Sequence, residues 1–108
     1  MDPIELPQGT LDLLVLRTLN SGEMHGWGIA QRLNLLSKDA LRLQEGTLYP
    51  ALYRMEAKGW ITAEWAQSEN NRRAKYYRLS KIGRKRLEYE KESWDRLASV
   101  IATIMREA

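Results

Sequence analysis

The chain has 108 residues, of which 44% are hydrophobic and 29% are charged, and it contains no cysteine. This length and composition are typical of one globular domain with a modest core, and they argue against an intrinsically disordered chain. The lack of cysteine excludes disulfide bonds and thiolate metal sites and is compatible with a reducing cytosol.

The first six residues lack the basic segment and the long apolar run of a signal peptide. No apolar run in the sequence approaches the roughly 20 residues that a membrane-spanning helix needs. We therefore expect a cytoplasmic protein with no membrane partner.

The net charge of +3 is modest, but its distribution is uneven. Residues 72–86 hold eight basic side chains and no acidic one, whereas the rest of the chain holds nine basic and fourteen acidic residues, a net charge of −5. Such a distribution gives one surface a positive field that attracts polyanions. The alternative interpretation is a solvated basic face without a partner.

Two helices are predicted in the first third of the chain. The first begins at Thr10 and continues to Leu19, and because it is apolar on nearly every side we expect it to be buried between two packing surfaces. A break at Asn20-Ser21-Gly22 precedes a second helix from about His25 to Leu36. The short segment Leu41–Leu43 is predicted to form a minor strand.

The third helix has the most clearly marked boundaries. Thr47 is suited to the N-cap position, Pro50 is expected in the first turn, and Gly59 is suited to the C-terminal stop. Leu48, Leu52 and Met55 then share one face at helical spacing. Tyr49, Arg54 and Lys58 are left for solvent or for a binding partner.

Two strands follow this helix. Apolar and polar residues alternate in residues 61–65 and again in residues 75–79, which is the period of a half-buried strand. The connection Gln67–Arg73 is too long for a two-residue hairpin and too polar to be buried. We expect it to project from the domain as a wing.

Ser80 is a plausible N-cap for a last helix that ends near Arg106. Leu87, Trp94, Ile101 and Ala108 recur every seven residues, and Leu97 and Ile104 form a second apolar register that Glu90 interrupts. A small domain cannot cover such a seam by itself, so we expect the helix to associate with a second copy, with a dimer as the default oligomer. The interface residues are predicted to be Leu87, Trp94, Leu97, Ile101 and Ile104.

Together these elements predict a mainly α fold with a small antiparallel β-wing, that is, a winged helix-turn-helix followed by a long C-terminal dimerisation helix. Residues 1–80 are expected to form the DNA-binding domain and residues 81–108 the dimerisation helix, as one compact unit. This outline indicates binding of duplex DNA.

The chain resembles the PadR family of bacterial transcriptional regulators. The matching segments are Leu11–Leu19, His25-Gly26-Trp27, Thr47–Leu52, Gly59-Trp60-Ile61, Arg73–Ser80 and Gly83-Arg84. Trp27 stands where the family usually has tyrosine, and Ser80 where it usually has threonine. With one C-terminal helix, the chain looks like the short PadR subfamily.

The resemblance implies a dimeric repressor that binds a pseudo-palindromic operator and senses ligands at or near the dimer interface. It also implies that Tyr49 contacts DNA. The phenol of Tyr49 can reach a phosphate oxygen near the start of the third helix. The alternative is that Tyr49 packs on the second helix.

Six further residues are predicted to contact DNA. Thr47 can donate a hydrogen bond to phosphate, although capping alone explains it. Arginine suits bidentate contact with guanine, which makes Arg54 a candidate for base recognition, unless it is solvated or pairs with a carboxylate. Lys58 is a candidate neighbour of phosphate. The wing residues Arg72, Arg73 and Lys75 are expected to contact the backbone or the minor groove.

Trp94 has two interpretations. It can pack in the dimer interface like its aliphatic neighbours, or two symmetry-related indoles can enclose a flat aromatic effector. The resemblance to short PadR proteins favours the second interpretation, and ordinary packing remains the simpler one. We therefore treat Trp94 as both an interface residue and a candidate effector-binding residue.

An enzyme is a poor fit to this sequence, which lacks a phosphate-binding glycine loop and clustered carboxylates and has one histidine, His25. We expect no catalytic residues, no metal site and no cofactor. A winged helix that binds only protein or structured RNA is the remaining alternative, which the basic wing disfavours.

Overall fold

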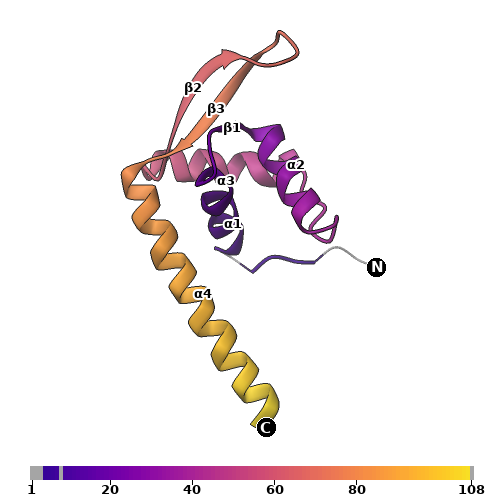
Figure 1. Cartoon of the computed structure of the whole chain (residues 1–108), viewed down its shortest axis with the longest axis vertical. Coiled ribbons are helices and arrows are strands. Elements are labelled where there is room, and N and C mark those ends of the chain that lie inside the picture. The colour runs from indigo at the N-terminus through magenta and orange to yellow at the C-terminus, as the bar shows by residue number, and fades with distance from the viewer. Residues whose placement is uncertain (1–3, 8, 108) are drawn as a thin grey trace.

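The computed structural model describes residues 4–7 and 9–107, so Ala108 of the predicted seam lies outside the described residues. Three short helices and a small sheet form a compact domain, from which one long helix extends (Figure 1). In chain order, the elements are α1 (Thr10–Leu19), β1 (Met24–His25), α2 (Gly26–Leu36), α3 (Glu45–Ala57), β2 (Ile61–Gln67), β3 (Arg73–Leu79) and α4 (Lys81–Glu107). None of the described helices is long and apolar enough to cross a membrane.

The three strands form one antiparallel sheet in the order β1-β3-β2. β2 and β3 pair from Ile61 opposite Leu79 to Gln67 opposite Arg73, which makes a long two-stranded hairpin. The hairpin projects from the helical domain as the expected wing (Figure 1). The predicted fold, a winged helix-turn-helix followed by a long helix, is confirmed.

The minor strand was predicted in the wrong place. The short strand is β1, beside β3, and Leu41–Leu43 is not a strand. Arg42 has a φ of 47°, which interrupts an extended backbone. The backbone of Leu43 is bound by the side chain of Asn34, which accepts from the Leu43 N–H at 2.6 Å and donates to its carbonyl oxygen at 3.0 Å.

The start of α3 was also predicted wrongly. The helix begins at Glu45 with Gln44 as N-cap, so Thr47 lies inside the first turn and Pro50 lies inside the helix. The amide groups of Thr47 and Leu48 both donate to the carbonyl oxygen of Gln44, at 3.1 Å each. Because the Asn34 side chain fixes the chain just before this point, the helix starts earlier than the capping pattern indicated.

The predicted end of α3 is confirmed. Gly59 has a φ of +77° and follows the C-cap residue Lys58. Its N–H donates to the Glu56 carbonyl oxygen at 3.0 Å, and the Trp60 N–H donates to that of Met55 at 3.1 Å. This is the hydrogen-bond pattern of a Schellman motif, and it turns the chain directly into β2.

The core lies where the three short helices meet the base of the sheet. The largest fully buried side chains are Val15, Leu16, Ile29, Leu48, Leu52, Met55 and Ile61. α1 packs against α2, α3, β3 and α4, which explains why it is apolar on nearly every side. Two polar residues of α1 are nevertheless buried, Asp12 and Thr18.

The first turn of α4 is tied to the turn after α3. Ser80 caps the helix as predicted, since its Oγ accepts from the Gly83 N–H at 2.9 Å. The same oxygen lies 2.6 Å from the carbonyl oxygen of Gly59 and 2.9 Å from that of Trp60. These contacts fix the direction in which α4 leaves the domain.

Leu87 was predicted to lie in the dimer interface, and the structure contradicts this. Its side chain is 4% exposed and belongs to the core of its own chain. Beyond this point α4 extends away from the domain (Figure 1). The first position of the predicted heptad seam is thus covered by this chain itself.

We expect Gly83→Ala to destabilise the protein. A Cβ at this position would lie 1.9 Å from the carbonyl oxygen of Trp60, which is backbone and cannot rotate away. Overpacking of this kind costs about 1–3 kcal/mol or more of the free energy of unfolding. Gly46→Ala is the control, because its Cβ would meet nothing within 4 Å. Thermal unfolding compares the two; equal stability would mean that α4 is not fixed at this contact.

Candidate nucleic-acid interface

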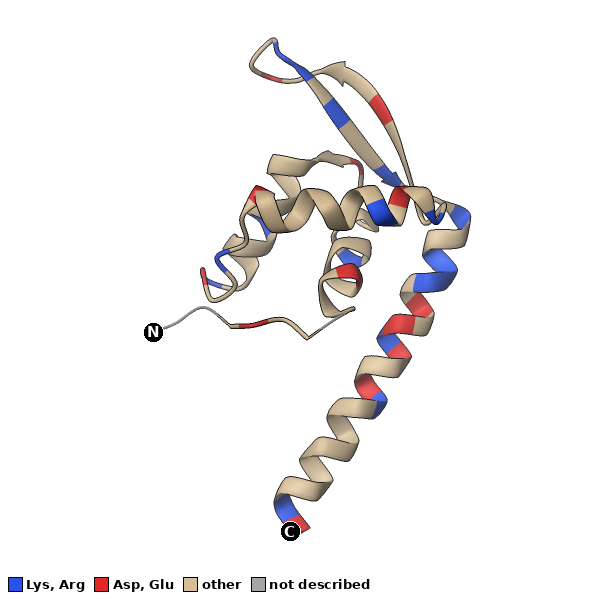
Figure 2. Cartoon of the chain, turned by 180° about the vertical axis from the view of Figure 1, so that it is seen from behind, with Lys and Arg blue, Asp and Glu red and all other residues tan. Residues whose placement is uncertain are grey.

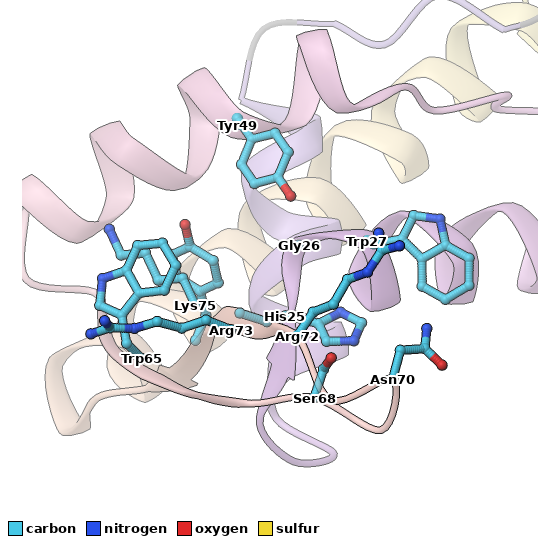
Figure 3. A pocket seen from close by; sticks show the side chains of 12 residues that line it. His25, Gly26, Trp27, Tyr49, Trp65, Ser68, Asn70, Arg72, Arg73 and Lys75 are labelled. Carbon is cyan, nitrogen blue, oxygen red and sulfur yellow. The ribbon is translucent and has the colours of Figure 1, made fainter.

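A concavity of about 730 Å³ separates the wing from the starts of α2 and α3. Its lining is aromatic and basic (Figure 3) and consists of His25, Gly26, Trp27, Tyr49, Trp65, Ser68, Asn70, Arg72, Arg73, Ala74, Lys75 and Tyr77. The wing is one wall of this concavity, and the helix-turn-helix is the other.

The register of the wing decides which side chains face the helices. The pairs Ala63–Tyr77, Trp65–Lys75 and Gln67–Arg73 lie on one face, because side chains alternate along a strand. Tyr77 at the base is buried, whereas the positions nearer the tip are polar or exposed. This inner face therefore changes from apolar at the core to cationic at the tip.

The tip of the wing is held by its own hydrogen bonds. The Ser68 N–H donates to the Arg72 carbonyl oxygen at 2.7 Å, and the Asn71 N–H donates to that of Ser68 at 3.0 Å. Asn71 has a φ of 62°, a conformation that asparagine tolerates well, and its Oδ1 accepts from the Gln67 Nε2 at 2.6 Å. These hydrogen bonds order the turn that precedes Arg72.

Arg72 and Arg73 are the cations of the wing that remain available. Neither forms an ion pair with any residue that the structure describes. The Arg73 guanidinium carbon lies 5.5 Å from the centre of the Trp65 ring, and both side chains line the concavity. A guanidinium over an indole keeps its N–H groups free for an anion.

Lys75 has a different role from the one predicted. Its Nζ donates to Glu56 Oε1 of α3 at 2.9 Å, and this hydrogen bond is the main reason why the pKa of Lys75 is raised. The charge of Lys75 is therefore compensated within the chain. Lys75 connects the wing to α3 and is a weaker candidate for a phosphate contact than Arg72 or Arg73.

Tyr49 fits both interpretations that the sequence left open. Its ring packs against the start of α2, where a Cβ on Gly26 would lie 2.7 Å from the ring. The side chain is nevertheless 42% exposed and lines the concavity. Partial burial, and then the nearby charge of Glu45, raise the pKa of Tyr49, so the phenol keeps its proton and can donate a hydrogen bond.

Arg54 is engaged by a carboxylate of its own chain. Its guanidinium pairs with the Asp12 carboxylate of α1, which is buried. The alternative interpretation, pairing with a carboxylate, is therefore the observed one. Lys58, which remains exposed, places its Nζ 4.7 Å from the centre of the Trp60 ring. The side chains of Arg54 and Lys58 thus lie on the side of α3 that faces α1 and α4, and neither lines the concavity.

The remaining basic residues of the 72–86 run have separate surroundings. Arg78 pairs with Glu23 at 2.9 Å on the outer side of the sheet. The guanidinium carbon of Arg86 lies 4.7 Å from the centres of the Trp60 and Tyr89 rings. The same guanidinium pairs with the Glu90 carboxylate at 2.6 Å. Lysine and arginine positions, blue in Figure 2, follow β3 into the start of α4. Only part of the positive run therefore faces the concavity.

The chain matches the model of the transcriptional regulator PadR-like family over residues 15–89. It belongs to this family. It is 31% identical over 94 residues to the transcriptional regulator Rv3488 of Mycobacterium tuberculosis, covering 87% of this chain and 84% of that protein.

Solved structures agree with this assignment. A PadR family transcription regulator from Clostridium difficile R20291 is 32% identical, with a TM-score of 0.76 over 90% of this chain and 99% of that one. A PadR-like transcriptional regulator from Bacillus cereus is 25% identical, with a TM-score of 0.80 over 94% and 96% of the two chains. The chain is thus a PadR-family transcriptional regulator with the winged-helix DNA-binding fold.

Three exposed aromatic residues, Trp27, Trp65 and Tyr53, were not candidates from the sequence. His25 accepts the Gly28 N–H at 2.9 Å and caps α2, while Trp27 and Trp65 are exposed at the concavity. Tyr53 is 75% exposed on α3. For Tyr53, the signal in the sequence is an aromatic residue at an outward position of the helix.

α4 carries an apolar stripe that its own chain covers only in part. Trp94, Leu97, Ile101 and Ile104 are each between 43% and 55% exposed. Residues 97–105 contain no charged side chain, and the distal half of α4 is uncharged almost to its end (Figure 2).

Among the described residues, no group of three histidine, aspartate or glutamate side chains could hold a metal ion.

Proposed function

We propose that this PadR-family protein is a homodimeric repressor that binds a pseudo-palindromic operator and is released by a small-molecule effector. The observation that supports DNA binding best is the basic, aromatic concavity beside α3, in which Arg72 and Arg73 have no carboxylate partner among the described residues. α3 then enters the major groove and the wing follows the adjacent backbone.

The proposed DNA contacts come in two groups. Thr47 and Tyr49 lie in the first half of α3, where the helix start and a phenol can bind phosphate. Arg72 and Arg73 bind the flanking backbone or the minor groove, and Lys58 is a peripheral phosphate neighbour. Arg54 and Lys75 support this surface through Asp12 and Glu56.

Dimerisation through α4 is supported by the exposed stripe of Trp94, Leu97, Ile101 and Ile104. Two copies that pack along this stripe would hide apolar surface that water otherwise contacts. They would also place two copies of α3 at a fixed separation, which a two-fold symmetric operator requires.

The proposed function is tested by capture of genomic DNA bound to the protein, followed by affinity measurements on the captured duplex. Binding should be much tighter to the captured site than to random duplex DNA and should fall steeply with salt. Equal affinity for structured RNA, or binding without salt dependence, would favour a winged helix that serves other partners. Expression of a reporter behind the captured site then distinguishes repression from activation.

Trp94→Ala should remove the response to planar aromatic compounds while leaving a dimer that binds DNA. The indole lines a small hollow of about 110 Å³ with Leu13 and Leu97. Loss of stacking on two indoles should weaken a flat ligand by roughly tenfold or more. Calorimetry on the wild type and on Trp94→Ala provides the comparison. Equal ligand binding by the two proteins would leave Trp94 as a packing residue.

A further inference from the structure

The outward face of α3 has an unusual composition. Gly46, Pro50, Tyr53 and Ala57 are spaced at i, i+4, i+7 and i+11, so they form one stripe along the helix. All four are exposed, and they lie opposite the buried residues of α3. Tyr53 is the only one of the four with a long side chain.

The side chains that commonly read bases in pairs of hydrogen bonds are missing from this stripe. Arginine, lysine, asparagine and glutamine do not occur in it. The nearest arginine, Arg54, is engaged by Asp12, and Lys58 lies over the Trp60 ring. If α3 enters the major groove, this stripe therefore offers no long polar side chain to the hydrogen-bond donors and acceptors on the base edges.

Thymine offers a different feature in the major groove, its C5 methyl group, which is the apolar group that marks an A·T pair. Tyr53 presents an aromatic ring that is 75% exposed. The small neighbours Gly46 and Ala57 and the compact ring of Pro50 allow the helix to approach the base edges closely. Packing of this solvent-exposed ring against a methyl group removes apolar surface from water, which makes the free energy of binding more favourable.

We propose that Tyr53 is a specificity-determining residue that recognises the C5 methyl group of thymine by apolar contact in each operator half-site. This inference rests on the proposed function, because it requires α3 to lie in the major groove. It shifts sequence recognition from Arg54, where the sequence suggested it, to an aromatic ring at the centre of the outward stripe.

Replacement of thymine by deoxyuridine tests this directly, because it deletes the methyl group and leaves the base pair intact. The captured operator is synthesised with one such replacement at a time, at matching positions of the two half-sites. At one or more positions, wild-type affinity should fall by about fourfold per half-site, the effect expected for one buried methyl group.

The variants identify the side chain responsible. Tyr53→Phe keeps the ring and should retain the deoxyuridine penalty, whereas Tyr53→Ala should bind thymine and deoxyuridine operators equally. Lys58→Ala, on the neighbouring face, should keep the full deoxyuridine penalty even where its overall affinity falls, because a phosphate neighbour does not contact the methyl group. An undiminished penalty in Tyr53→Ala, or no penalty at any position in the wild type, would overturn the proposal for Tyr53 while leaving operator binding intact.

Failure of the proposed function gives a different result. In that case the wild type binds its captured duplex no better than random duplex at any salt concentration, and the role of Tyr53 is overturned with it. Thermal unfolding of each variant shows whether it is folded. Because Tyr53 is exposed, its replacement is expected to leave the unfolding temperature nearly unchanged.

Discussion

Ile101→Glu is expected to convert the proposed dimer into monomers and to abolish tight binding to the proposed operator. Ile101 lies in the middle of the exposed stripe on α4, between Leu97 and Ile104. In the proposed dimer a carboxylate at this position would be buried in an apolar interface without a partner, which is strongly unfavourable. Sedimentation velocity measures the oligomer, and titration with labelled operator measures the affinity.

The loss of affinity should be much larger than the loss of any single DNA contact. Two linked modules bind two half-sites with an effective concentration that can raise the overall affinity by 10²–10⁴-fold over one module. A monomer has no such advantage. Ser99→Glu is the control, since Ser99 is exposed on the opposite face of α4 and should leave both properties unchanged. A dimeric Ile101→Glu protein would contradict the proposed interface.

The elements that the sequence predicted well have local causes. The bounds of α1 and α2, the end of α3 at Gly59 and the start of α4 after Ser80 depend on apolar spacing and on residues within a few positions. The two strands of the wing show their alternation directly in the sequence. Such signals are contained in short segments, so one chain is enough to read them.

The errors concern contacts between distant segments. Arg54 and Asp12 are 42 residues apart, and Lys75 and Glu56 are 19 apart, so neither pair could be recognised before the fold was known. The same applies to the start of α3, which depends on a hydrogen-bonded loop around Asn34. A basic residue near the DNA-binding surface can therefore support that surface instead of contacting DNA.

The heptad pattern of α4 has a related limit. Leu87 and Ile101 occupy equivalent positions of one repeat, but Leu87 is 4% exposed and Ile101 is 49% exposed. Periodicity identifies the apolar face of a helix, and it does not tell which partner covers each part. The fold divides this face into a buried part that anchors α4 to the domain and an exposed part that the proposed dimer would cover.

Replacement of both Arg72 and Arg73 by alanine should weaken DNA binding by a similar factor on every sequence. Both side chains belong to the wing wall of the concavity and have no ion-pair partner among the residues that the structure describes. If each neutralises one phosphate, its loss reduces the slope of log affinity against log salt by about 0.9 unit. The expected change is roughly one to two units per protomer.

Arg78→Ala is the matched control for this double variant, because Arg78 belongs to the same strand but pairs with Glu23 on the outer side of the sheet. It should leave the salt slope unchanged. Affinities are measured by fluorescence anisotropy on operator and random duplexes between low and moderate salt. If the double variant lost affinity with an unchanged slope, the two arginines would act by a means other than phosphate neutralisation. If it lost affinity on the operator alone, they would read its sequence or its shape, and the wing would contribute to specificity, as we propose for α3.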